Sequence, residues 1–273
     1  MSAVVAPKRR RFAMSGRIGA GLVGFWLLVA LFGPMLAPHA VGEVVDLDVF
    51  SPASAAFPLG TDYLGRDMLS RVLSAARHTV VIAFLATSLS AAAGYFCGLL
   101  AGAGGWGDLL LSRVFDTIIA IPGLMFSLVV IASLGASIPV LIATLAVVYM
   151  PGAFRTARAL AMRVMALDFV TVARARGERL PSIVVREVLP NVTGPLLADF
   201  GLRFVFVVLL LSGLSFLGLG VQPPQADLGA LVRENIAGLG FGAWAVLVPA
   251  VAIATLTIGI NLTIDALPRR GRR

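Results

Sequence analysis

Six long apolar runs constrain this chain more than any other feature of its sequence. They cover residues 18–37, 78–103, 114–135, 137–154, 195–217 and 241–264. Each run is close to the ~20 residues that cross the hydrocarbon core of a bilayer as a helix. Lipid offers no partner for backbone polar groups, so a segment that crosses it alone has to be helical. The sequence therefore predicts an all-α polytopic membrane protein with six transmembrane helices.

Prolines and small residues mark three of these runs. Pro139 and Pro151 bracket the run 137–154, and Pro122 inside the run 114–135 predicts a kink or a locally opened helix. In the run 78–103 small residues recur every four positions, at Ser90, Gly94, Gly98 and Gly102. This spacing lets helix backbones approach closely in lipid. It fits plain helix packing and also a moving interface in a transport pathway.

The basic residues indicate how the chain is oriented. The net charge is +8, and the basic residues gather in the tail 1–17, in the stretch 155–186 and in the tail 268–273. This distribution follows the positive-inside rule for cytoplasmic segments and argues against a nucleic-acid partner. We expect both termini in the cytoplasm, an uncleaved anchor at 18–37 and an external loop at 38–77. A signal peptide is less suitable, because its apolar region is shorter.

Several catalytic devices are absent from the sequence. The only lysine is Lys8, so no P-loop lysine can reach a nucleotide phosphate, and the two histidines, His39 and His78, are isolated. Cys97 is the single cysteine, which excludes a disulfide framework and a cysteine-based metal site. We expect a chain that is not an enzyme and binds no cofactor or metal of its own.

Two ionisable residues fall within the fifth run. Asp199 and Arg203 lie four positions apart, so they can pair on one helix face. Asp116 and Asp265 lie near the ends of the third and sixth runs. No series of carboxylates crosses the middle of the bilayer, which argues against a proton-driven transporter.

A polar stretch with helical periodicity separates the fourth and fifth runs. Its apolar residues recur at the spacing of one helical face, and these are Leu180, Ile183, Val184 and Val188. We expect a short amphipathic helix at 177–191, ended near Pro190 and preceded by a turn at Gly177. Such a helix could dock into a groove on a partner or lie on the lipid surface.

The surrounding passage "FVTVARARGERLPSIVVREVLPN" resembles the cytoplasmic Glu-Ala-Ala loop of binding-protein-dependent ABC importer permeases. The matching positions are Thr171, Val172, Ala173, Gly177, Leu189, Pro190 and Asn191. The stretches "PLGTDYLGRDMLSRVLSAAR" (58–77), "LSFLGLGVQPP" (214–224) and "NLTIDAL" (261–267) are similar to passages of the dipeptide, oligopeptide and nickel permeases. Their order resembles the second permease subunit of such systems. Thr171 stands where this family usually has glutamate, Glu187 where histidine is common, and Leu228 where tryptophan is frequent.

The resemblance implies a type I ABC importer permease fold with its core at 78–267. Its cytoplasmic loop, 166–191, would carry a coupling helix that docks on an ATPase. The coupling residues that it implies are Thr171, Ala173, Gly177, Leu180, Ile183, Val184, Glu187, Leu189 and Pro190.

The resemblance also implies a bacterial inner-membrane complex. Its other members would be a homologous second permease, two ABC ATPases that bind ATP and magnesium, and an external solute-binding protein. The cargo would be peptides or a related small solute such as nickel or a metal chelate. A secondary transporter or channel that works alone, and a membrane scaffold, are the alternatives. The first would need charged relays or inverted repeats, which the sequence lacks.

Overall fold

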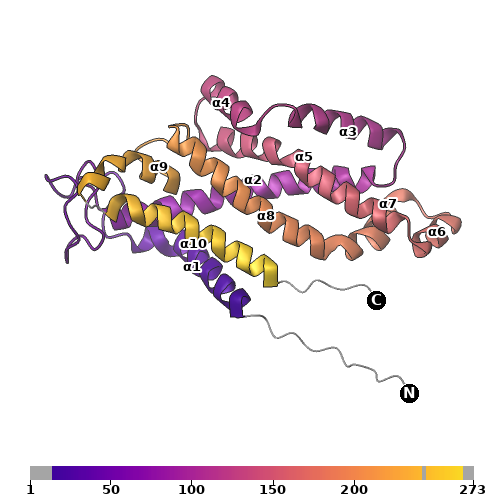
Figure 1. The fold of residues 1–273 in the computed structure, drawn as a ribbon, viewed down its shortest axis with the longest axis horizontal. Helices are drawn as coiled ribbons and strands as arrows, with labels where there is room; N and C mark the ends of the chain where they lie inside the picture. The colour runs from indigo at the N-terminus through magenta and orange to yellow at the C-terminus, as the bar shows by residue number, and fades with distance from the viewer. Residues whose placement is uncertain (1–13, 242–243, 267–273) are drawn as a thin grey trace, which may run out of the picture.

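The computed structural model describes residues 14–241 and 244–266, and Figure 1 shows them as an elongated bundle of helices. Within these residues regular secondary structure is helical, apart from two isolated β-bridges, Val44–Arg66 and Thr61–Asp67. The tails predicted at 1–17 and 268–273 fall outside the described residues except for 14–17, which belong to the first helix.

Ten α-helices, one π-helical turn and one 3₁₀ segment follow one another along the described chain. They are α1 (Met14–Leu36), α2 (Met68–Ala101), α3 (Trp106–Ile119), α4 (Gly123–Leu134), α5 (Ile138–Met165), α6 (Asp168–Ala175), α7 (Leu180–Ile183), η1 (Val184–Val188), α8 (Leu189–Phe216), α9 (Leu228–Glu234), η2 (Ile236–Phe241) and α10 (Trp244–Ala266).

The membrane-spanning segments agree with the predicted fold class. Five helical segments are long and apolar enough to cross a bilayer, and the pair α3–α4 makes a sixth if it counts as one span. The two helices of this pair are bent by 78° at the break before Gly123. Pro122 lies in this break, as expected for a residue that cannot continue a helix. The prediction of an all-α polytopic protein is therefore confirmed.

Two helices extend beyond their predicted boundaries. α2 begins at Met68, so the last ten residues of the predicted external loop 38–77 are helical. The Asp67 side chain caps this helix by accepting hydrogen bonds from the backbone N–H groups of Leu69 and Ser70. Arg71 in the first turn is buried beside two carboxylates, and this neutralisation lets a charged turn pack inside the protein.

The fourth span also runs further than predicted, because α5 continues through Pro151 to Met165. The polar half of α5 forms ion pairs with α3. The Arg158 guanidinium donates to the Asp108 carboxylate, with 2.7 Å between Nη2 and Oδ2, and Arg155 Nη2 lies 2.6 Å from Asp116 Oδ1. These partners come from another helix, so a hydropathy pattern could not indicate them.

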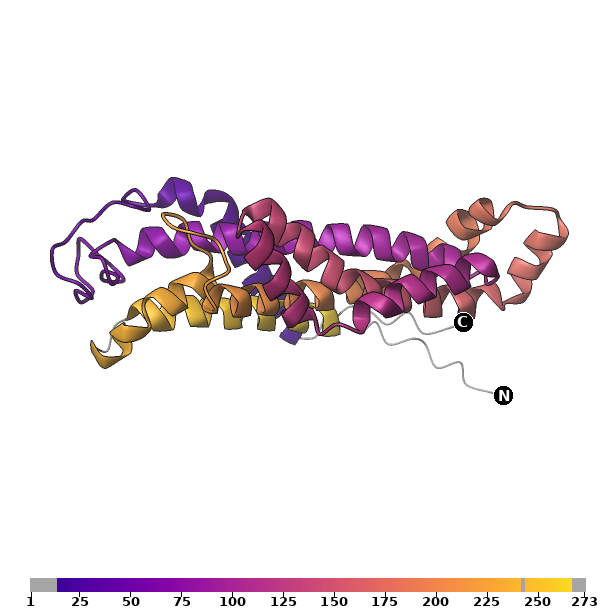
Figure 2. The ribbon, with the colours of Figure 1, turned by 90° about the horizontal axis from the view of Figure 1, so that it is seen from above.

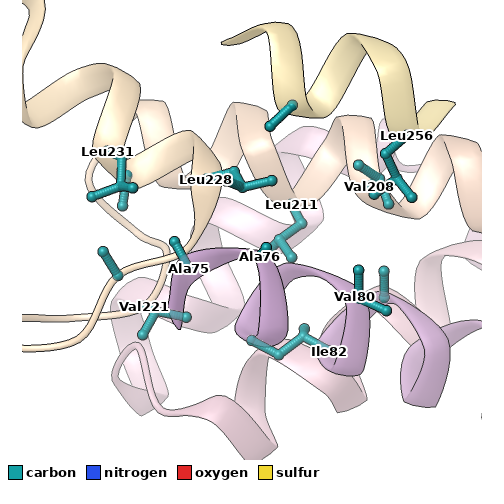
Figure 3. Packing of buried hydrophobic residues seen from close by; sticks show 14 of the residues in the cluster. Ala75, Ala76, Val80, Ile82, Val208, Leu211, Val221, Leu228, Leu231 and Leu256 are labelled. Atoms are coloured by element: carbon teal, nitrogen blue, oxygen red, sulfur yellow. The ribbon is translucent and has the colours of Figure 1, made fainter. Parts of the chain in front are cut away.

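The half of the bundle that carries α9 has a large apolar core. Figure 3 shows part of this core, which includes Ala76 of α2, Leu211 of α8, Leu228 and Leu231 of α9, and Leu256 of α10. α1 and α10 pack together at its edge. There the indole Nε1 of Trp26 donates to Thr255 Oγ1 at 3.0 Å.

Glycines bring α2 and α5 into close contact. A Cβ atom added at Gly98 would lie 2.5 Å from the carbonyl oxygen of Phe154, and one added at Gly94 would lie 2.7 Å from that of Met150. Both distances are far below normal contact. The small-residue spacing of this run is therefore used for helix packing.

This close approach predicts a strong effect of Gly98→Leu. The leucine side chain has no space, so α2 and α5 must separate, and overpacking of this kind costs about 1–3 kcal/mol. We expect a lower thermal unfolding temperature for the detergent-purified protein. Gly24→Leu on α1 is the matched control, because nothing lies within 4 Å of a Cβ atom there. Equal unfolding temperatures for the two variants would contradict the prediction.

Candidate functional site

The segment 166–191 forms a helical hairpin at one end of the bundle. Figures 1 and 2 show α6 and α7 projecting beyond the long helices, at the end opposite to α9. α5 ends at Met165, α6 follows after a short link, and the chain then turns back into α7. This is the passage in which the sequence predicts a coupling element.

The turn of this hairpin depends on Gly177, whose φ is +79°. Its N–H donates to the carbonyl of Arg174 at 2.9 Å, and the N–H of Glu178 donates to the carbonyl of Ala173 at 3.2 Å. These two bonds form a Schellman motif, which ends α6 and requires a residue in the left-handed region. The predicted turn at Gly177 is therefore present.

The expected short helix at 177–191 is not a separate element. α7, η1 and α8 form one continuous helical segment from Leu180 to Phe216, and the separate short helix of this region is α6. Pro190 does not end it. Proline lacks an N–H, and the turn before it is widened into a π-helix in which Leu189 N–H donates to the carbonyl of Val184.

Most side chains of the predicted docking face are buried within the protein. Ile183 and Val184 are only 1% and 6% exposed, and Val188 is fully buried. They pack against Ala157 and Ala161 of α5 in a core that the hairpin shares with the bundle. The prediction that Ile183 and Val184 offer a free face to a partner is therefore wrong, because the chain itself buries that face. Ala173 is buried in the same core.

Other apolar side chains of the hairpin are exposed. Leu167 (46% exposed), Phe169 (40%) and Val172 (53%) lie in α6 or directly before it, and Leu180 (40%), the exposed member of the predicted face, begins α7. We call these four side chains the α6 face. Among the predicted coupling residues Thr171, Leu180, Leu189 and Pro190 are exposed, and Glu187 is half-buried.

Exposed arginines occur in the same segment as the α6 face. Arg174, Arg176 and Arg179 are exposed, and Arg176 Nη2 lies 2.8 Å from Glu178 Oε1. Sequence reasoning missed Leu167, Phe169 and Val172 as surface residues. The signal was the stretch "LDFVTVA" (167–173), which carries more apolar residues than one side of a two-turn helix can bury.

Asp199 and Arg203 lie together inside the spanning part of α8. Arg203 Nε is 2.6 Å from Asp199 Oδ2, and Nη2 is 3.0 Å from Oδ1, so the pair is bidentate. Tyr95 of α2 donates to Asp199 at 2.8 Å, and Thr156 of α5 donates to it at 3.1 Å. We call these four residues the polar node.

A second group of buried charges lies at the opposite end of the bundle. Asp62 Oδ2 accepts from Arg66 Nε at 2.7 Å and from Arg71 Nη1 at 2.6 Å. Arg71 Nη1 also lies 2.8 Å from Glu234 Oε2 in α9. We call these four residues the α9 charge cluster. It joins the segment 37–67 to α2 and α9.

Asp227 organises the passage 214–224 next to this cluster. Its carboxylate caps α9 and also accepts from Ser215 Oγ at 2.7 Å and from the N–H of Val221 at 2.9 Å. Burial raises the pKa of the Asp227 carboxyl, and these hydrogen bonds act in the opposite direction. Among the described residues no cluster of His, Cys, Asp and Glu has the arrangement of a metal site.

Comparison with known proteins gives a consistent result. Residues 91–273 match the family described as binding-protein-dependent transport system inner membrane component. The chain is 34% identical over 261 residues to the di/tripeptide transport system permease protein DppC of Pseudomonas aeruginosa, which covers 92% of this chain and 86% of that protein.

Two further relatives show the range of related proteins. The chain is 30% identical over 261 residues to the dipeptide transport system permease protein DppC of Alkalihalophilus pseudofirmus, covering 95% of this chain and 85% of that protein. It is 29% identical over 262 residues to the glutathione transport system permease protein GsiD of Pectobacterium atrosepticum, covering 95% and 87%.

Proposed function

Because this chain belongs to the family of inner membrane components of binding-protein-dependent transport systems, we propose that it forms half of a translocation pathway for short peptides. As a member of this family it is a multi-pass permease subunit of an ABC importer. It is not an enzyme, since ATP hydrolysis in such systems lies with the ATPase subunits.

The names of the relatives support peptides as the cargo. The relatives described above are named for dipeptides, di/tripeptides and glutathione, all of which contain peptide bonds. This favours short peptides over nickel or a metal chelate. A homologous second permease, two ATPases and an external solute-binding protein would complete the importer.

The α6 face is the surface proposed to dock on the ATPase. The ATPase has to transmit its movement to the permease. The contact surface therefore needs to be apolar, to bind, and rigidly attached to the membrane-spanning helices, to pass the movement on. The α6 face is exposed, while the other side of α6 is anchored by Val170 and Ala173 in the shared core. A short helix of this kind fits the helix-in-groove mode of recognition. The arginines of the same segment would pair with acidic groups on the rim of such a groove.

The direct test is co-purification and reconstitution. The permease, produced with the second permease and the ATPases of its own system, should be retained with them in mild detergent. Proteoliposomes that also contain the solute-binding protein should take up radiolabelled Ala-Ala only when ATP is present. Uptake by the permease alone, driven by an ion gradient, would instead support the secondary transporter or channel.

The proposed orientation places the α6 end in the cytoplasm. In Figure 1 the first turn of α1 and the last turn of α10 are the ends of these helices that point toward α6, and exposed arginines are frequent in the segment 155–186 that includes α6. Cysteines placed at Ser51 and Gln225 in a Cys97→Ala background should react with an impermeant thiol reagent added outside intact cells. Cysteines at Ser15 and Ser182 should not react. External labelling at Ser182 would reverse the orientation and remove the basis for ATPase docking.

A further inference from the structure

We infer that Arg203 is a positioning residue that locks α8 to α5 and α2, so that movement of the α6–α8 hairpin reaches the spans as one rigid displacement. This inference rests on the proposed function, in which an ATPase moves the hairpin. The observation that carries it is the polar node, a set of polar groups on three helices within the spanning part of the protein.

Each nitrogen of the Arg203 guanidinium donates to a neighbouring group. Nε and Nη2 bind Asp199, Nη1 donates to the carbonyl of Tyr149 at 3.1 Å, and Nη2 also donates to Thr156 Oγ1 at 3.2 Å. All three nitrogens thus have protein partners. Four of the five N–H groups of the guanidinium are used in this way, and their partners lie on α5 and α8, so the node connects helices.

A glycine on α5 leaves the space that the Arg203 guanidinium occupies. A Cβ atom added at Gly152 of α5 would lie 2.6 Å from Arg203 Nη1. Glycine weakens the interior of a helix, and here its absent side chain provides the space for the guanidinium. Gly152 therefore allows α8 to bond to α5 at a point where Pro151 already interrupts the backbone ladder.

The node also lies in a suitable place to transmit a displacement. α8 leads without interruption from η1 through Val192 and Leu196, which pack in the core of the hairpin, to Asp199 one turn later. Tyr95 connects the same carboxylate to α2. An ion pair with side chains 10% and 16% exposed is costly to separate, because each charge alone would be poorly solvated. α2, α5 and α8 should then move together.

Gly152→Ala tests whether Arg203 holds α8 to α5, and it does so without removing any charge. We call this attachment the lock. The added methyl group displaces the guanidinium from its place between α5 and α8, and Gly194→Ala on α8 is the matched control because nothing lies within 4 Å of a Cβ atom there. In the reconstituted complex we expect Gly152→Ala to keep ATP hydrolysis while uptake of radiolabelled Ala-Ala per ATP falls about fivefold, the lower end of typical coupling between sites. The control should retain the wild-type ratio.

A distance measurement separates this inference from the proposed function. Spin labels at Ala159 of α5 and Leu197 of α8, both exposed, report the relative position of the two helices without any substrate. In a Cys97→Ala background the wild-type distance should be narrow and equal in the nucleotide-free and the ATP–vanadate states. Gly152→Ala should broaden it.

The outcomes are distinct. An importer without ATP-dependent uptake would overturn the proposed function, and the label distances would still test the lock. A narrow, unchanged distance in Gly152→Ala, or a fall of uptake and ATP hydrolysis in equal proportion, would overturn the inference. If Gly152→Ala does not assemble, Tyr95→Phe removes one hydrogen bond of the node without adding volume. It should also lower uptake per ATP, and a wild-type ratio would refute the lock.

Discussion

Phe169→Asp is expected to abolish ATP-dependent uptake while the permease remains folded and abundant in the membrane. The phenyl ring is part of the exposed α6 face, so its replacement removes no contact of the hairpin core. An acidic residue in the first turn of α6 is compatible with the helix dipole. If the Phe169 side chain is buried against an ATPase as proposed, losing this burial costs about 1.5–3 kcal/mol of binding free energy. This weakens binding about 10- to 150-fold. An unpaired carboxylate in the groove adds to this loss.

The measurement is co-purification of the ATPases in mild detergent, with the permease unfolding temperature recorded in parallel. Ile183→Asp is the matched variant, since it places the same carboxylate on the buried side of the same hairpin. It should lower the unfolding temperature and the membrane abundance, because Ile183 belongs to the hairpin core. If Phe169→Asp kept its ATPases, the α6 face would not be the docking surface.

Arg71→Ala is expected to cause the largest loss of stability. The Arg71 side chain is fully buried and lies within ion-pair distance of both Asp62 and Glu234. Its removal leaves two buried carboxylates that share only Arg66, whose contact with Glu234 is 3.5 Å. Breaking a buried ion pair by removing one partner costs about 3–5 kcal/mol. The unfolding temperature should fall by roughly 10 °C, and the segment 37–67 should become sensitive to protease.

An exposed pair provides the control for this prediction. Arg176 and Glu178 form an ion pair at 2.8 Å with side chains 61% and 25% exposed. Exposed pairs contribute about 0–1 kcal/mol, so Arg176→Ala should leave the unfolding temperature almost unchanged. Equal effects of the two variants would mean that the α9 charge cluster does not stabilise this end of the bundle.

The sequence predicted the spans because hydropathy over ~20 residues is a local property. Pro122 similarly predicted the break between α3 and α4. The first turns of α2 were not predicted to be helical, because they contain the charged Arg71. Glu234, which helps to neutralise Arg71, lies more than 160 positions away in the sequence. α5 was predicted too short for the same reason, since Asp108 on another helix pairs with Arg158.

The face of the hairpin was misassigned for a different physical cause. Periodicity at Ile183, Val184 and Val188 correctly indicates an apolar helical face, but it cannot tell whether this chain or a partner buries it. The structure places that face against α5, and the exposed apolar side chains lie on and beside α6 instead. Asp199 and Arg203 were predictable as a pair from their spacing. Tyr95 and Thr156 were not, because they come from other helices.

The glycine contacts between α2 and α5 limit where a transported solute can pass. At Gly94 and Gly98 the two backbones leave less room than one methyl group requires, so no solute can pass between these helices. α2 and α5 therefore form one continuous barrier. In the proposed importer a peptide would therefore cross along the surface of this helix pair, where a second permease would close the other half of the route.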